Sequence, residues 1–190
     1  ITPIFTQVAA ICNGGTLDVL PTRSDNNITG TWSPAINNTV TTTYTFTPNA
    51  SETCAENQSM TITVNPIITP TFTQVGAICA GETLSDLPTT SANGVSGTWS
   101  PGMNNTATTT YTFTPNASET CAENQSMTIV VNLVITPTFT QVGAICAGET
   151  LSDLPTTSAN GVSGTWSPAM NNTATTSYTF TPNASEICAE

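Results

Sequence analysis

The stretch TTTYTFTPNASETCAEN, residues 41–57, indicates the fold through its pattern of side chains, and it occurs more than once in the chain. The same letters stand at 108–124, and a close copy, TTSYTFTPNASEICAE, occupies 175–190. Within it, Tyr44 and Phe46 alternate with threonines, which is the period-two pattern of a strand with one buried face. The PNAS segment behind it is typical of a turn. The motif therefore predicts a β-strand followed by a tight reversal of the chain.

The repeat is regular along the whole chain, since Ile1 corresponds to Ile68 and Ile68 to Ile135. The first and second copies agree at 50 of 67 positions, and the second and third agree at 53 of the 56 positions that both contain. Self-similarity at a fixed period indicates an array of similar domains. We predict three of them, at residues 1–67, 68–134 and 135–190. The third stops before the counterpart of NQSMTIVVNLV, which reads as a strand, so we expect the chain to be a window onto a longer array.

Composition narrows the possible functions. The chain of 190 residues has 12 acidic residues and one basic residue, Arg23, which gives a net charge of −11. A groove for nucleic acid needs many bases, so nucleic-acid binding is excluded and binding to an anionic membrane surface is disfavoured. The chain has no histidine, which removes Ser-His-Asp and Cys-His catalysis. No apolar run approaches the roughly 20 residues of a membrane helix.

The sequence predicts an all-β fold. It contains 42 Thr and 18 Asn with no sustained helical periodicity, and Thr favours strands while Asn favours turns. In the first repeat we expect strands at 3–9, 15–21, 28–32, 41–48 and 59–65, which suggests a small antiparallel sandwich. The predicted core consists of one Trp, one Tyr and one Phe in each repeat: Trp32, Tyr44, Phe46, Trp99, Tyr111, Phe113, Trp166, Tyr178 and Phe180.

A domain this small builds only a weak hydrophobic core, and disulfide bonds between the six cysteines would add the stability that it lacks. They stand two in each repeat, at the same spacing every time: Cys12 and Cys54, Cys79 and Cys121, Cys146 and Cys188. We expect one disulfide within each repeat, which by chain entropy would contribute roughly 4 kcal/mol. Two alternatives stay open: pairs across the linkers, Cys54 with Cys79 and Cys121 with Cys146, or six free thiols. Persistent disulfides would indicate an extracellular setting.

Neither the linkers nor the carboxylates show a pattern that indicates catalysis or metal binding. Pro66, Pro70 and Pro137 restrict the backbone at the repeat boundaries, which predicts short, semi-rigid junctions. Without CxxC or His, a zinc site is disfavoured. The acidic residues near the cysteines read better as solvated loops than as an acid/base pair or a calcium site; they are Glu52, Glu56, Glu119, Glu123, Glu186, Glu190, Asp18, Asp86 and Asp153. We predict neither a cofactor nor a metal.

The pattern ITPTFTQV, GTWSP and TYTFTP followed by a second cysteine resembles a known group of repeats. It is similar to the Ig-like repeats of giant surface proteins of gliding, type IX-secreting bacteria, such as SprB-like gliding-motility adhesins. The resemblance covers essentially the whole chain, three times over. It implies an Ig-like sandwich, secretion to the bacterial cell surface and a role in adhesion or motility. It carries over no binding site.

We therefore expect a non-enzymatic extracellular array, the stalk or filament of an adhesin. Repetition adds length and multivalency, whereas an enzyme gains little from copies of its site. The expected partners are neighbouring repeats and, in a filament, identical chains. The alternative is a module that binds carbohydrate or another surface by avidity, and an exposed Trp99 would favour it.

Overall fold

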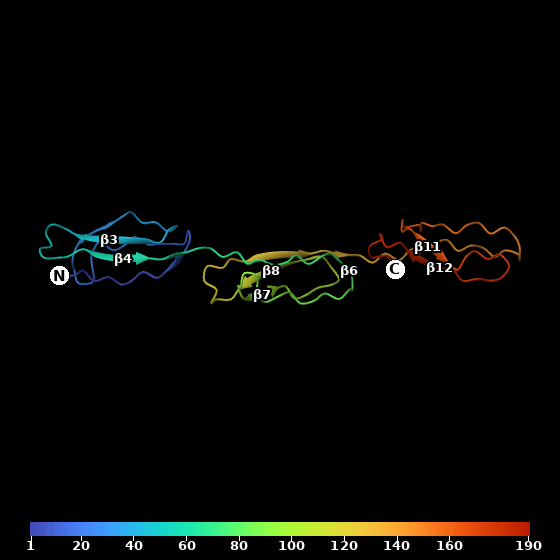
Figure 1. The fold of residues 1–190 in the computed structure, drawn as a ribbon, viewed down its shortest axis with the longest axis horizontal. Helices are drawn as coiled ribbons and strands as arrows, with labels where there is room; N and C mark the ends of the chain where they lie inside the picture. Colours follow the sequence, from blue (N-terminus) through green and yellow to red (C-terminus); the bar gives the residue numbers. More distant parts are fainter. The chain divides into compact units, whose positions relative to one another are not determined.

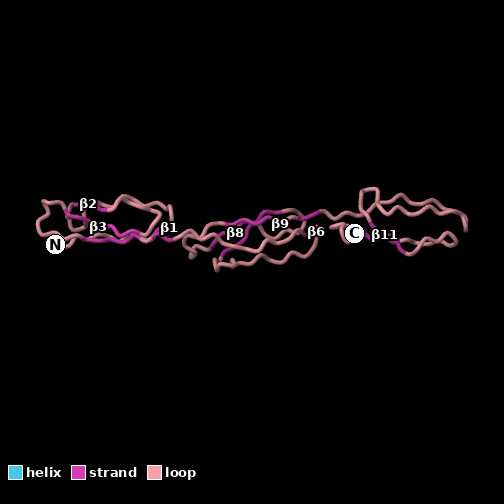
Figure 2. The backbone as a smooth tube through the Cα atoms, turned by 45° about the horizontal axis from the view of Figure 1, so that its top comes forward, coloured by secondary structure: helices cyan, strands magenta, loops and turns pink.

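A computed structural model describes residues 1–190 and contains strands, turns and irregular segments but no helix. The predicted all-β class is confirmed. Most of the chain is loop, and the strands are short pieces within it (Figure 2). The chain divides into two compact units. The first unit holds Ile1–Phe72, Pro88–Trp99 and Phe113–Gln125, and the second holds Thr73–Leu87, Ser100–Thr112 and Ser126–Glu190.

Twelve strands are present, and the first two repeats have the same five in the same order. In the first repeat they are β1 (Ile11–Cys12), β2 (Gly30–Ser33), β3 (Thr42–Pro48), β4 (Gln58–Ile62) and β5 (Val64–Asn65). In the second they are β6 (Ile78–Cys79), β7 (Gly97–Ser100), β8 (Thr109–Pro115), β9 (Gln125–Ile129) and β10 (Val131–Asn132). The third repeat has β11 (Gly164–Ser167) and β12 (Thr179–Pro182).

The central sheet of the first repeat has the order β2-β3-β4 and is antiparallel, with β3 and β4 side by side in Figure 1. Tyr44 lies opposite Met60, and both side chains are buried. On the other face the hydroxyl oxygens of Thr43 and Thr61 lie 2.7 Å apart. The alternation in TTTYTFTP therefore separates a core face from a polar face. The second repeat has the same order, β7-β8-β9.

The core lies on the aromatic face of this sheet. In the first repeat Leu20, Tyr44, Met60 and Ile62 form it, and partly buried apolar side chains pack against it, namely Phe5, Val8, Leu17 and Trp32. The Phe5 ring lies 4.8 Å from the Trp32 ring and 4.7 Å from the Phe46 ring, and both other repeats contain the same three-ring cluster. The predicted Tyr and Phe residues of repeats one and two are fully buried, whereas the three Trp rings are half-buried.

The third repeat is more open because β12 has a single partner strand. In β3, Thr42 and Tyr44 pair only with β4, while Thr47 and Pro48 pair only with β2. The sequence ends at Glu190, before any counterpart of β4, and β12 retains only the four residues that pair with β11. Tyr178 and Phe180 are half-buried rather than buried.

Two predicted strands do not form. Residues 3–9 and 15–21 take part in no sheet, and the predicted strand 59–65 is divided into β4 and β5. Side-chain contacts fasten the first segment instead. The Gln7 amide donates a hydrogen bond of 2.9 Å to the Thr61 carbonyl of β4, and Phe5 packs on the core. The alternation in residues 3–9 reflects this packing and not ladder pairing.

A glycine at the start of β7 allows a close approach of two strands. A Cβ atom on Gly97 would lie 2.6 Å from Cζ of Phe113 and nearer still to the Thr114 carbonyl oxygen, whereas one on Gly102 would meet nothing within 4 Å. We expect Gly97→Ala to destabilise the protein by about 1–3 kcal/mol, because the strand or the ring must shift. Gly102→Ala should change stability by no more than about 0.5 kcal/mol. Thermal unfolding followed by circular dichroism compares the two, and equal effects would contradict this account of the sheet.

Candidate functional site: the disulfide-linked junctions

The segment that connects the first repeat to the second runs beside residues of the first repeat. Strand β5 pairs in parallel with β1, so that Val64 lies opposite Ile11 and Asn65 opposite Cys12. The Ile11 amide donates to the Thr63 carbonyl at 3.0 Å, and the Asn13 amide donates to the Asn65 carbonyl at 2.8 Å. The outgoing chain is therefore a strand of a small sheet and not a free tether.

Three residues later the same segment pairs with the second repeat. The Ile68 amide donates to the Cys121 carbonyl at 2.8 Å, and the Glu123 amide donates to the Ile68 carbonyl at 3.0 Å. Ile68 and Ala122 form a parallel bridge. The connecting segment, residues 63–68, is thus hydrogen-bonded to one repeat and then to the next.

A disulfide joins the two flanks of this segment. It links Cys12 to Cys121, whose Cα atoms lie 5.4 Å apart and which are 109 residues apart in sequence. Cys12 belongs to the strand that pairs with the end of the first repeat, and Cys121 belongs to the loop that receives Ile68. All of these residues lie in the first compact unit. The disulfide therefore bridges the boundary between the first and the second repeat.

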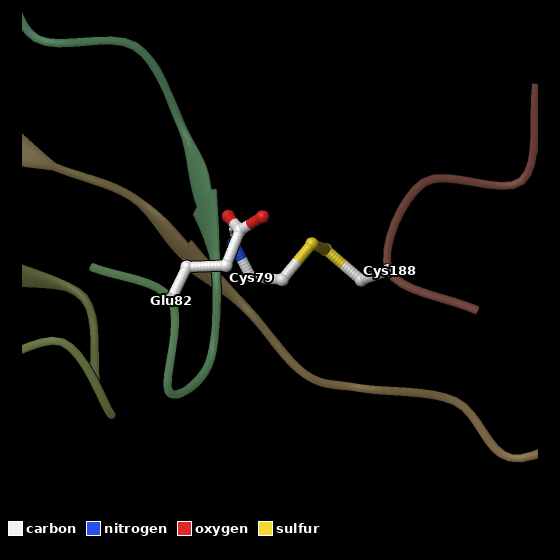
Figure 3. Close-up of a disulfide and its surroundings, with 3 residues drawn as sticks. All are labelled: Cys79, Glu82 and Cys188. Carbon is white, nitrogen blue, oxygen red and sulfur yellow. Dashed lines mark hydrogen bonds between the residues drawn. A yellow bond between two sulfur atoms is a disulfide. The ribbon is translucent and has the colours of Figure 1, made fainter. Parts of the chain in front are cut away.

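The second junction, which lies in the second compact unit, has the same design. Strand β10 pairs in parallel with β6, and Ile135 donates to the Cys188 carbonyl at 2.8 Å. Cys79 and Cys188 form a disulfide with Cα atoms 5.4 Å apart. Figure 3 shows this bond, with the Glu82 carboxylate turned toward the Cys79 backbone; the Cys79 amide donates to it at 2.6 Å.

The predicted cysteine pairing is wrong, and so are both alternatives. Each disulfide joins the first cysteine of one repeat to the second cysteine of the following repeat, and Cys54 and Cys146 are free and exposed. The reason is that the two cysteines of one repeat serve different junctions. Cys12 lies beside the outgoing chain at Asn65, whereas the Cys54 carbonyl accepts a hydrogen bond from Ile1, where the repeat begins.

The second cysteine of every repeat sits in a left-handed backbone conformation. The φ angles are 66° at Cys54, 64° at Cys121 and 64° at Cys188, a region that non-glycine residues rarely occupy. The turn that precedes this cysteine is stabilised by hydrogen bonds to a residue outside the loop. In the first repeat the Glu52 carboxylate accepts hydrogen bonds from the Thr29 hydroxyl at 2.6 Å and the Thr29 amide at 2.8 Å. These bonds fix the loop that presents the cysteine.

The Thr29 hydroxyl, and secondly the Thr29 amide, lower the pKa of Glu52, because both hydrogen bonds favour the ionised form. This is the opposite of what a general acid at neutral pH requires. The other predicted loop carboxylates form no metal cluster, since no group of three Cys, Asp or Glu side chains lies close enough together to hold an ion. Glu52 has a structural task in its loop.

A groove of about 770 Å³ opens in the third repeat, between Phe139, Trp166 and Tyr178. In the first repeat Met60 and Ile62 of β4 lie in the core on this face of the sheet. In the third repeat the sequence given stops at Glu190, before the position of a counterpart to β4. The groove is therefore an uncovered core face.

The tryptophans do not form open platforms. The Trp99 ring is half-buried and lies 4.8 Å from Phe72 and 5.3 Å from Phe113. Its indole N–H donates to the Pro88 carbonyl at 2.9 Å. Trp32 and Trp166 make the same bond to Pro21 and Pro155. A sugar-binding site uses aromatic faces that are free, and these rings are committed to packing within the repeat.

Comparison with known proteins does not add a relative. No protein-family model, curated protein sequence or solved structure matches the chain. The fold contains no helix long and apolar enough to cross a membrane. Its two disulfides are compatible with a secreted or extracellular protein, since such bonds persist in oxidising compartments. The junctions are thus the feature of the chain from which a function can be inferred.

Thiol counting tests the pairing of the cysteines. The sequence TPNASETCAENQSM occurs at both 47–60 and 114–127, so peptide masses do not separate Cys54 from Cys121. Serine variants do. We expect two free thiols in the unreduced protein, one in Cys54→Ser and three in Cys121→Ser, because only the second variant releases Cys12 from a bond. Pairing within repeats would give no free thiol in the parent and one in each variant.

The loop of Cys54 also gives a prediction for pH. The lowered pKa of Glu52 means that its ionised form stabilises the fold above its ordinary pKa, and this contribution is lost as the pH falls through the lowered value. Thr29→Val keeps the backbone N–H and removes the hydroxyl, so the pKa of Glu52 should rise toward its ordinary value. Carbon-13 NMR titration of the Glu52 carboxyl measures this. Thr31→Val, on the adjoining strand, is the control and should leave the titration of Glu52 unchanged.

Proposed function

We propose that this chain is an extracellular structural array that limits extension, part of the stalk or filament of a cell-surface adhesin, and that it has no catalytic role. Its repeats are Ig-like domains in this proposal. The all-β fold, with a small antiparallel sheet and a three-ring core in each repeat, supports that assignment. The observation that carries the proposal is the overlap of the two disulfides.

The two covalent loops overlap along the chain. The first spans residues 12–121 and the second spans 79–188, so residues 79–121 belong to both. A pulling force that enters at Ile1 reaches Cys12 and crosses the first disulfide to Cys121. It then runs back along the chain to Cys79 and crosses the second disulfide to Cys188. Two longer segments, residues 12–79 and 121–188, run in parallel with parts of this route, so the path through both disulfides is the shortest and becomes taut first.

The overlap shortens the chain that force can draw out. The covalent route contains about 55 residue steps, against 189 in the linear chain, and an extended residue spans at most roughly 3.3–3.6 Å. The unfolded oxidised protein therefore reaches only about 190 Å, whereas the reduced protein reaches about 650 Å. A stalk with this design therefore extends less when its domains unfold under load than a chain without the disulfides would.

The remaining features of the chain suit an external stalk. Successive copies agree at 50 of 67 and at 53 of 56 positions. Such repetition suits a structure whose length matters more than the detail of any one repeat. The single basic residue leaves a trypsin-like protease one place to cut. Secretion to a bacterial surface by a type IX route and a part in gliding belong to the same proposal and rest on the resemblance of the repeats.

Single-molecule stretching between the two ends tests the proposal. We expect a maximal extension that corresponds to about 55 residues when oxidised and the full chain when reduced. Cys121→Ser should lengthen the oxidised route to about 80 residues, because force must then follow the chain from Ile1 to Cys79.

Cys54→Ser is the matched control and should leave the oxidised extension unchanged. Full extension of the oxidised parent, or no change in Cys121→Ser, would rule out a load path through the disulfides.

A further inference from the structure

Three asparagines of the chain stand directly before a glycine: Asn13, Asn93 and Asn160. An asparagine in this position can lose its side-chain nitrogen, because glycine has no side chain to hinder the approach of its backbone nitrogen to the carboxamide carbon. In a folded protein the reaction also requires that the asparagine side chain is free to turn toward that nitrogen. The three sites differ in this freedom.

The side chains of Asn93 and Asn160 are held by hydrogen bonds. Oδ1 of Asn93 accepts from the Thr71 amide at 3.1 Å and from the Ser91 hydroxyl at 2.7 Å. Its Nδ2 donates to the Thr69 carbonyl at 3.0 Å. Asn160 makes the corresponding bonds in its own repeat, at 3.1, 2.7 and 2.9 Å. Both carboxamides are therefore fixed in place.

The side chain of Asn13 is free. It is exposed, and it makes no hydrogen bond within the protein, since only the backbone amide of this residue donates, to the Asn65 carbonyl at 2.8 Å. Gly14 follows with a left-handed backbone, at a φ angle of 77°. A free carboxamide thus stands before a glycine, directly beside Cys12 of the first disulfide.

We propose that Asn13 is a site of spontaneous modification, at which the folded protein forms aspartate and isoaspartate while Asn93 and Asn160 stay intact. The backbone nitrogen of Gly14 attacks Cγ of Asn13, loses its proton and expels the side-chain nitrogen as ammonia, which closes a cyclic imide. Water then opens the ring at either of its carbonyl carbons. One opening leaves aspartate, and the other leaves isoaspartate, in which the backbone runs through Cβ. Water is the only co-reactant.

The group is present at the first junction alone. Ala80 and Ala147 stand where Asn13 does in the second and third repeats. The turn is the same without the asparagine, since Gly81 also has a left-handed backbone and its amide donates to the Asn105 carbonyl at 2.8 Å. Alanine therefore fits this position, and the turn does not need the carboxamide.

The modification loosens the anchor of the outgoing chain at this junction. Both products add a negative charge next to Cys12, and isoaspartate also lengthens the backbone between positions 13 and 14 by one carbon atom. The extra length displaces the Gly14 amide from the Asn38 carbonyl, to which it donates at 2.9 Å, and so weakens the turn at the end of β1. The first junction becomes more mobile with age, whereas the second does not. This change is independent of the stalk role.

Trypsin separates the reactive site from the protected ones. Arg23 is the single basic residue, so the reduced, unfolded protein is cut into residues 1–23, where Asn13 is the sole asparagine, and residues 24–190, which contain Asn93 and Asn160. The folded, oxidised protein is incubated at mildly alkaline pH, and samples are then unfolded, digested and weighed by mass spectrometry.

We expect residues 1–23 to gain the mass of one deamidation and to become a substrate of isoaspartyl methyltransferase. Residues 24–190 should react at least about tenfold more slowly, because several hydrogen bonds must break first. In protein that is incubated unfolded, all three sites are free, so this difference should shrink.

Asn13→Ala is the matched control, because the other repeats carry alanine there. Its fragment 1–23 should keep its mass. Hydrogen exchange around β1 and β5 should quicken with incubation in the parent and stay constant in this variant. A folded parent whose fragment 1–23 keeps its mass would overturn the proposal, and so would equal rates in both fragments of the folded protein. Neither result would alter the route of force through the disulfides, so this proposal and the stalk proposal fail separately.

Discussion

The backbone pairing of the connecting segments is the constraint on which the rest of the structure depends. Residues 63–68 run in parallel with Ile11 and Cys12 of one repeat and then with the loop around Cys121 of the next. A tether without such pairing would leave the two cysteines no fixed separation. Because the segment is hydrogen-bonded on both sides, the loops that flank it are brought to within the reach of a disulfide.

The core of each repeat has the task of positioning its two ends. Tyr44 and Phe46 hold β3 between β2 and β4, and the Glu52 turn continues from β3 to the left-handed Cys54. The first cysteine is placed by its pairing with β5, which follows β4 along the chain. One face of a small sheet thus determines where both cysteines lie, one beside the start of the repeat and one beside its outgoing chain.

Much of the local structure could be predicted because its causes are local. The alternation of Tyr44 and Phe46 with threonine identified β3 and its buried face, and GTW and SMTI marked β2 and β4. Residues 3–9 showed a similar alternation, yet they form no strand, since the Gln7 side chain and the Phe5 ring attach them to the sheet. Alternation records which side chains are buried, and it does not record whether the backbone finds a ladder partner.

By itself the sequence determined the regular threefold repeat, the all-β class, the buried Tyr and Phe residues of the first two repeats and the lack of any histidine for catalysis. It did not determine the cysteine partners, for a physical reason that the repeats make plain. Cys54 and Cys121 lie in the same string of letters, TPNASETCAENQSM, so no local property of Cys12 favours one over the other. Only the tertiary structure decides, because Cys54 faces the start of its own repeat while Cys121 lies across the connecting segment from Cys12.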